Sequence, residues 1–226
     1  MKPSKNFLSR RKLTPGELPE IYRRLLKAFG HRAWWPGDTP FEIIVGAILT
    51  QNTAWTNVEK ALLNLKRAGK LTVKAMHGTK ASTLARLIRP AGYFNVKAKR
   101  LKHFTDFLTR RYGGSLAAMF RQDAASLRQE LLGVNGIGPE TADSILLYAG
   151  GKLTFVMDAY TKRIFSRHGL HDFEADYHEW QRLFHNALPP KVSLYNDFHA
   201  QIVELGKRHC KATRFDCEGC PLASYL

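Results

Sequence analysis

The sequence is poor in cysteine and in acidic residues, and it has no long apolar run. Its three cysteines all lie beyond residue 209, which excludes the disulfide framework of a small secreted domain. No stretch of about 18 apolar residues occurs, so we expect no membrane-spanning helix. The first residues are basic but have no apolar centre, and they therefore do not resemble a secretory signal. These absences predict a cytoplasmic protein with no membrane partner.

The shortage of acidic residues determines the charge. Lysine and arginine number 35 against 19 aspartates and glutamates, and the formal net charge is +16. Such an excess favours a polyanionic partner, first of all nucleic acid, although a merely basic, solvated surface is the alternative. With 226 residues and a hydrophobic content of 44%, the chain can form one large globular domain or two small ones.

Helical signals run along nearly the whole chain. The segments beginning at Thr14 (TPGE) and Thr39 (TPFE) each combine an N-cap threonine, a proline at the first helical position and the glutamate of a capping box. Further helical patterns extend over 54–68, 80–88, 95–111, 124–132, 139–149, 159–168, 175–187 and 194–209. Only the segment 152–157 (KLTFVM) is extended in character, and it is too short to build a sheet. We predict an all-α fold.

A glycine-rich turn lies within the segment 133–143 (GVNGIGPETAD), between two predicted helices. Gly136 and Gly138 can adopt a positive φ and allow another backbone to approach closely. The N–H groups of the turn, with the start of the next helix, suit a phosphate oxygen. Val134 and Ile137 would anchor the turn in the core. The alternative is an ordinary αα-hairpin capped by glycine, but the net charge favours binding to the DNA backbone.

Asp158 directly precedes the predicted helix 159–168. Aspartate is a preferred N-cap residue, which is one interpretation of this position. A carboxylate at a helix N-terminus also keeps a low pKa and stays ionised. Cleavage of an N-glycosidic bond needs such an anion near the developing sugar cation, together with an oriented water. The two interpretations are compatible.

Three collinear motifs resemble the helix-hairpin-helix DNA glycosylases, the superfamily of endonuclease III. They are residues 131–170, which contain the glycine turn and Asp158, residues 48–62 (ILTQNTAWTNVEKAL) and residues 89–101 (RPAGYFNVKAKRL). The resemblance covers residues 37–226. It implies a monomer with a six-helix domain over 37–152 that ends in the hairpin, and a second helical domain formed by 1–36 and 153–226. A cleft between the two domains would hold a base flipped out of double-stranded DNA.

The resemblance also implies roles for individual residues. Gln51 would fill the gap that the flipped base leaves in the stack, although its alternative role is that of an ordinary polar residue at a helix C-terminus. The positions that would contact DNA are Gln51, Gly133, Val134, Gly136, Ile137 and Gly138.

The position of Glu140 separates two classes of these enzymes. Bifunctional members carry a lysine there, whose amine forms a Schiff base with the sugar. Glu140 cannot form this imine, so we expect no lyase activity and a monofunctional enzyme that uses Asp158 and water. Adenine-mismatch glycosylases place a catalytic glutamate where this chain has Ala47, while Glu42 nearby is accounted for by its capping box.

The closest resemblance is to the 3-methyladenine DNA glycosylases of endonuclease III type. It implies that Trp34, Pro36 and Trp55 line the base pocket, with core packing as the alternative role of the tryptophans. Alkylated purines are cationic and stack well on indole rings. We therefore expect a base-excision repair enzyme, associated with the nucleoid, that removes alkylated purines. The alternatives are a glycosylase for oxidised pyrimidines or mismatches and a non-catalytic DNA-binding module.

The cysteines are spaced C-x6-C-x2-C at Cys210, Cys217 and Cys220. This spacing resembles the first three ligands of the [4Fe–4S] loop of endonuclease III. The position of the fourth cysteine is Leu226, whereas such a cluster takes four thiolates. Three alternatives follow. The cluster is lost; or its fourth ligand is another side chain, a water or a residue beyond this sequence; or the site binds zinc, with His209 as a ligand. The expected chemistry needs no cofactor.

Overall fold

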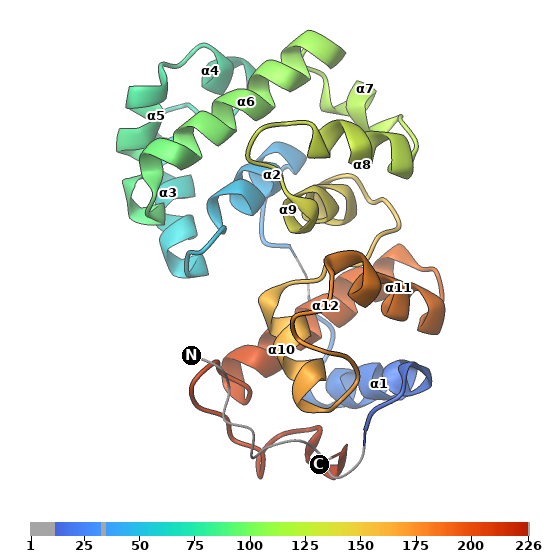
Figure 1. Ribbon diagram of the computed structural model, residues 1–226. Coiled ribbons are helices and arrows are strands. Elements are labelled where there is room, and N and C mark those ends of the chain that lie inside the picture. Colours follow the sequence, from blue (N-terminus) through green and yellow to red (C-terminus); the bar gives the residue numbers. More distant parts are fainter. Residues whose placement is uncertain (1–11, 33–34, 226) are drawn as a thin grey trace. The chain divides into compact units, whose positions relative to one another are not determined.

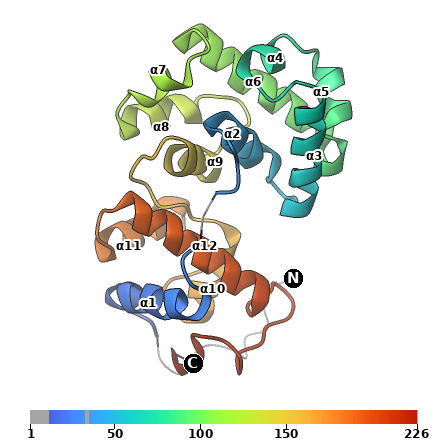
Figure 2. The same cartoon turned by 180° about the vertical axis from the view of Figure 1, so that it is seen from behind.

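The computed structural model describes residues 12–32 and 35–225, and these residues form helices joined by turns and loops (Figure 1 and Figure 2). The described residues contain no β-strand, and the pairing of Cys210 with Phe215 is an isolated bridge. The segment 152–157 forms no strand. The predicted all-α fold is confirmed. None of the described helices has the length and apolar character needed to cross a membrane.

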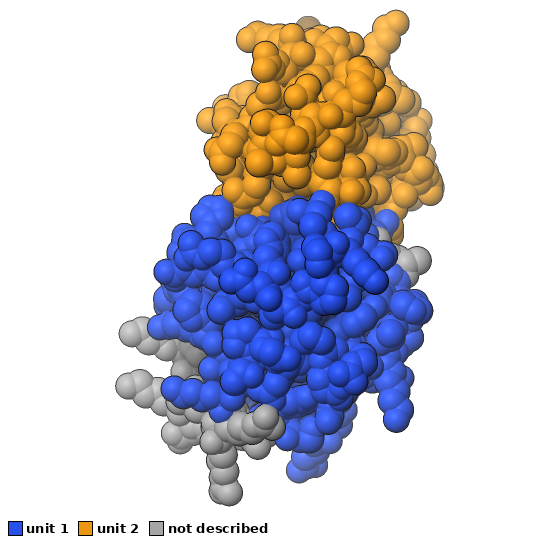
Figure 3. Space-filling model, turned by 90° about the vertical axis from the view of Figure 1, so that its right-hand side faces the viewer, with its two compact units in different colours: residues 1–35, 153–226 blue, residues 36–152 orange. Residues whose placement is uncertain are grey.

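The chain divides into two compact units (Figure 3). Unit 2 consists of Pro36–Lys152. Unit 1 combines the described residues up to Trp35 with those from Leu153 onward.

Unit 2 is built around α2 (Pro40–Leu49), which is apolar and buried over most of its circumference. Such a helix belongs in the centre of a core rather than at a surface. The helices around it are α3 (Trp55–Arg67), α4 (Val73–His77), α5 (Ala81–Leu87), α6 (Phe94–Tyr112), α7 (Leu116–Phe120), α8 (Ala124–Leu132) and α9 (Pro139–Ser144), which continues into a π-helical turn, Ile145–Ala149. The five-residue helices α4 and α7 were not predicted, because they are too short to show a helical period.

A buried lysine joins three segments of unit 2. Lys97 is only 1% exposed, and its Nζ donates to the carbonyl oxygens of Leu49 (2.9 Å) and Ala91 (2.7 Å) and to Oγ1 of Thr53 (2.8 Å). Burial lowers the pKa of Lys97 to about 8, and the nearby charge of Arg100 acts in the same direction. The three acceptors compensate the ammonium for its lost water. They also attach the segment that follows α2 to the start of α6.

An ion pair connects the two helices of the hairpin. Asp143 on α9 is fully buried, and Arg128 on α8 binds it with both arms of its guanidinium: Nε lies 2.8 Å from Oδ1 and Nη2 lies 3.1 Å from Oδ2. This bidentate geometry is the strongest form of the pair. The relative orientation of α8 and α9 therefore depends on a charge that is out of contact with water.

Unit 1 is centred on α12 (Val192–Arg208), which packs against α1 (Leu18–Phe29) and α10 (Ala159–Arg167) (Figure 2). The third flanking helix is α11 (Tyr177–Ala187). The core between these helices is aromatic, with Phe155, Phe165, Phe184 and Phe198 fully buried in mutual tilted or edge-on contact. This packing brings α12 next to the N-terminus of α10.

Removing one partner of the Arg128–Asp143 pair should destabilise the protein strongly. Arg128→Met leaves a buried carboxylate without its guanidinium, and we expect the free energy of unfolding to fall by about 3–5 kcal/mol. The double variant Arg128→Met, Asp143→Leu should lose less, because no uncompensated charge remains. Urea unfolding at neutral pH measures both. Arg23→Met, which breaks an exposed pair with Glu20, is the control and should cost less than about 1 kcal/mol; an equal loss in this control would contradict the interpretation.

Candidate nucleic-acid interface and active site

The hairpin turn occupies residues 133–138, between the end of α8 and the start of α9. Gly136 has a φ of +91°, as expected for a glycine that reverses the chain. A Cβ there would also lie 2.8 Å from Cδ and 2.9 Å from Nε of Arg100. Gly138 differs from the expectation: its φ is −93° and its ψ −179°, an extended conformation open to any residue, and a Cβ would meet nothing within 4 Å. The requirement for glycine is therefore at Gly136.

Val134 and Ile137 fix the turn to the core of unit 2, as predicted. Both side chains are buried, and their N–H groups donate within the turn, to the carbonyl oxygens of Leu131 and Val134, each at 3.0 Å. Their contribution is thus to the shape of the turn. The N–H groups of Gly136 and Gly138, in contrast, have no acceptor among the described residues. Two backbone donors of the turn are left for a ligand.

Gln51 lies against this turn. Its Nε2 donates to the carbonyl oxygen of Gly136 (3.1 Å) and to Oγ1 of Thr141 (2.8 Å), and its Oε1 accepts a hydrogen bond from Nη1 of Arg100. The structure therefore brings together Gln51 and the glycine turn, which are far apart in the sequence. Any insertion of Gln51 into a duplex requires that these bonds be exchanged.

Two residues beside this region have a left-handed backbone that side chains rarely adopt. Asn52 has a φ of 52° and Tyr93 a φ of 42°. They flank the Lys97 site, because Thr53 Oγ1 donates to the carbonyl oxygen of Ala91 at 2.5 Å. Tyr93 is 72% exposed, an unusual position for an aromatic ring, and strain of this kind is common at functional sites. Tyr93 lies within the segment 89–101 but is not among the predicted site residues.

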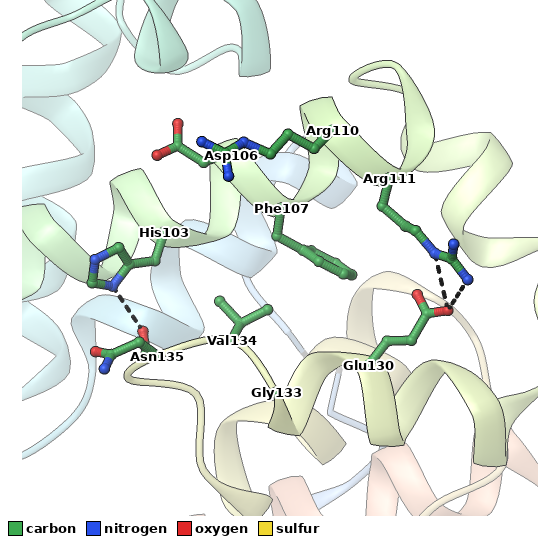
Figure 4. Close-up of a pocket in the computed structure, with 9 residues that line it drawn as sticks. All are labelled: His103, Asp106, Phe107, Arg110, Arg111, Glu130, Gly133, Val134 and Asn135. Atoms are coloured by element: carbon green, nitrogen blue, oxygen red, sulfur yellow. Dashed lines mark hydrogen bonds and ion pairs between the residues drawn. The ribbon is translucent and has the colours of Figure 1, made fainter.

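A groove of about 600 Å³ opens beside the hairpin (Figure 4). It is lined by His103, Asp106, Phe107, Arg110 and Arg111 of α6, by Glu130 of α8, and by Gly133, Val134 and Asn135 of the turn. Arg111 pairs with Glu130 at 3.1 Å, and His103 Nδ1 lies 3.2 Å from the carbonyl oxygen of Asn135. Arg110 is exposed and has no acidic partner among the described residues. The two arginines of the lining are matched by Asp106 and Glu130, so the groove carries no formal net charge, and its cation without a described acidic partner beside the turn is Arg110.

The predicted base-pocket residues are only partly described. Trp34 lies outside the described residues. Pro36 is exposed, and Trp55 begins α3, where its ring packs against the core of unit 2 and its indole N–H donates to Glu59 at 2.9 Å. Their role as a base pocket remains a prediction.

Asp158 is the N-cap of α10, as predicted. Its Oδ1 accepts the backbone N–H of Thr161 at 2.7 Å and the Thr161 hydroxyl at 2.8 Å. Its Oδ2 lies 3.5 Å from Nε2 of His199, on α12, and the side chain is 12% exposed. Burial by itself raises the pKa of Asp158, but His199 and the bonds from Thr161 outweigh this effect, so the pKa lies below its ordinary value. The carboxylate is both nearly enclosed and ionised.

The other two acidic candidates occupy structural positions. Glu140 is exposed in the first turn of α9, where an acidic residue complements the helix dipole. Glu42 is buried: its N–H donates to Oγ1 of Thr39, and its carboxylate accepts the N–H of Asp38 and pairs with Lys66 at 2.7 Å. These contacts account for Glu42 without a catalytic role.

The three cysteines line one small cavity of unit 1, which His209 and Asp216 also border. Nη1 of Arg167 lies 3.0 Å from Sγ of Cys210, and His209 Nδ1 faces Asp216 at 3.5 Å. Among residues 12–32 and 35–225, no group of three or more histidine, cysteine or acidic side chains has the arrangement of a metal site. Three thiols do not supply the four ligands of a cubane cluster, so the described residues do not fit that group.

The fold, the glycine-turn hairpin and the capped aspartate define a class of DNA-repair enzymes. The chain belongs to the HhH-GPD superfamily of base excision DNA repair proteins, whose sequence profile matches residues 45–190. It is an endonuclease III-like DNA glycosylase of base-excision repair.

Three known proteins show the extent of the similarity. The "Putative DNA repair glycosylase MJ1434" of Methanocaldococcus jannaschii is 46% identical over 207 residues, which cover 91% of this chain and 94% of that protein. Endonuclease III of Thermotoga maritima is 27% identical over 92% of this chain and 91% of its own. The crystal structure of H. pylori 3-methyladenine DNA glycosylase (MagIII), bound to 1,N6-ethenoadenine, is 32% identical with a TM-score of 0.74, covering 87% of this chain and 98% of that one.

The two neighbouring glycines of the turn should respond differently to alanine. We expect Gly136→Ala to lower the free energy of unfolding by about 2 kcal/mol, because alanine is strained at a positive φ and the new Cβ displaces Arg100. Gly138→Ala is the matched control and should cost less than about 1 kcal/mol, the effect of a poorer N-cap residue. Urea unfolding of both variants checks this. Equal losses would contradict the assigned backbone conformations.

Proposed function

We propose that this protein is a monofunctional glycosylase that removes alkylated purines, of the 3-methyladenine type, from double-stranded DNA. The observation that carries the proposal is the combination of Glu140, at the position of the bifunctional lysine, with an ionised Asp158. Because a glutamate cannot form an imine with the sugar, water is the nucleophile. The 32% identity to a 3-methyladenine DNA glycosylase supports the substrate class.

The hairpin would hold the DNA through its backbone. The N–H groups of Gly136 and Gly138 are suited to a phosphate oxygen. His103 and Arg110, in the groove beside the turn, would add attraction that is independent of sequence. Gln51 would exchange its bonds with the turn for bonds in the gap left by the flipped base.

Asp158 would carry the chemistry. An N-alkylated purine already bears a positive charge and departs easily, so the enzyme mainly has to stabilise the sugar cation that develops. The ionised carboxylate supplies that charge and orients the attacking water. Trp34, Pro36 and Trp55 would hold the base, and stacking of a cationic purine on an indole contributes about 0.5–2 kcal/mol.

An activity on oxidised pyrimidines or mismatched bases is the second candidate, supported by the identity to endonuclease III of Thermotoga maritima. A panel of duplexes, each with one lesion, separates the two activities. Release of methylated purine without strand cleavage supports the first, and release of oxidised pyrimidine the second.

Asp158→Asn should slow base release strongly while leaving the fold intact. Asparagine is an equally good N-cap and keeps the shape of the side chain, so the loss is that of the negative charge. We expect the single-turnover rate of base release from methylated DNA to fall by at least about 100-fold, with affinity for the duplex nearly unchanged. A non-catalytic DNA-binding module would show no activity in the wild type and no change on substitution.

Borohydride trapping tests the role of position 140. The wild type should give no covalent adduct with an abasic or lesion-containing duplex, because position 140 carries a glutamate instead of the lysine that forms the imine. Glu140→Lys is the matched gain-of-function variant, since the exposed first-turn position accepts a lysine without repacking. We expect this variant to give a trapped adduct. An adduct with the wild type would overturn the monofunctional mechanism.

A further inference from the structure

We propose that His199 is a positioning residue for Asp158. The imidazole of His199 holds one oxygen of the Asp158 carboxylate, and the free lone pair of that oxygen is left to bind the attacking water. This inference rests on the proposed function of Asp158. His199 lies in the middle of α12 and is 3% exposed, with its ring edge-on to Phe155 at 6.2 Å between centroids. Its Nε2 is 3.5 Å from Oδ2 of Asp158, at the outer edge of hydrogen-bonding distance.

The two oxygens of Asp158 have different surroundings. A carboxylate oxygen accepts two hydrogen bonds well. Oδ1 receives both of its bonds from Thr161, one from the backbone N–H and one from the hydroxyl. Oδ2 faces only His199 in the described structure, so one acceptor position remains there. The geometry therefore assigns the water to Oδ2.

His199 also favours the charged form of the carboxylate. Burial opposes the ionisation of Asp158 and is the largest single influence on its pKa. The charge of His199 and its hydrogen bond are the next largest influences, and both favour the ionised form. Without His199, the bonds from Thr161 alone would have to offset the burial.

Other charged groups of the packed helices are engaged elsewhere. On α10, the three basic side chains donate to backbone carbonyl oxygens: Lys162 to Ala175, Arg163 to Cys210, and Arg167 to Lys211 and Ala212. On α12, the two acidic side chains have other partners: Asp197 binds Tyr22, His31 and Arg32, and Glu204 binds Arg32 and Arg208. Tyr177 and His185 flank the segment that leads to Asp158, and each accepts a backbone N–H there, from Met157 and Phe155. His199 is thus the described side chain whose charge acts on Oδ2.

The test compares His199→Phe, which keeps the ring shape but has no N–H, with His199→Gln, which keeps a donor. The readout is the single-turnover release of base from methylated duplex DNA as a function of pH. We expect His199→Phe to lower the rate at neutral pH by at least about tenfold. The acid limb of the profile should move to higher pH, because the pKa of Asp158 rises. His199→Gln should recover part of the rate, and duplex affinity should stay the same.

His168→Phe is the control for the loss of a buried histidine. His168 is also buried in unit 1 but is not among the groups that shift the pKa of Asp158, so the acid limb of the His168→Phe profile should not move. A wild-type rate and profile in His199→Phe would overturn the proposal. So would equal losses in His199→Phe and His199→Gln with no shift of the acid limb, because that pattern marks a purely structural role.

A stability measurement separates this proposal from the proposed function. Since the folded pKa of Asp158 is below its ordinary value, the ionised form stabilises the fold above the ordinary pKa, and this stability is lost as pH falls through the folded pKa. Urea unfolding of the wild type, Asp158→Asn, His199→Phe and the double variant measures the coupling. We expect His199→Phe to cost less in the Asp158→Asn background. If the two substitutions are coupled in stability but the wild type releases no base, only the glycosylase function is refuted. If their effects on stability are additive, the contact between His199 and Asp158 is refuted.

Discussion

A charge removed from water must have a partner inside the protein, and this constraint organises the functional segments of both units. Lys97 binds three oxygens and thereby attaches the segment that carries Gln51 to the start of α6. Arg128 and Asp143 join the helices of the hairpin. In unit 1, Asp158 is held by the N-terminus of α10 and by His199. In each case a residue with a proposed role in DNA binding or chemistry is kept in place by a pairing that is costly to break.

The hairpin shows how steric and polar requirements combine at one point. The missing Cβ of Gly136 leaves room for Arg100, and the guanidinium of Arg100 in turn binds Gln51. Gln51 donates to the carbonyl oxygen of Gly136, so the three residues form a closed network of contacts. The N–H groups of Gly136 and Gly138 are not part of this network. The turn that we propose as a phosphate interface is therefore already formed in the protein alone, whereas the proposed movement of Gln51 into a duplex has a defined set of bonds to exchange.

Local signals predicted much of this structure. The capped helix starts, the helical periods and the N-cap role of Asp158 depend only on neighbouring residues, and the structure has them at the predicted places. The capping box predicted at Thr39 is only half formed, because the carboxylate of Glu42 accepts the N–H of Asp38. The prediction that Gly138 adopts a positive φ was wrong, because the sequence does not distinguish an extended glycine from a left-handed one. The short helices α4 and α7 carried no period that could be detected.

The sequence by itself determined the fold class, the order of the motifs and the residue types available for chemistry, because periodicity, capping and turn formation are local. Only the tertiary structure decided which distant side chains meet. Asp158, Gln51 and Lys97 have partners from distant parts of the chain, and no spacing of residues in the sequence predicts these contacts. The ionisation of Asp158 depends on this difference: the cap supplies its hydrogen bonds locally, but its burial and the nearness of His199 arise only when α12 packs against α10.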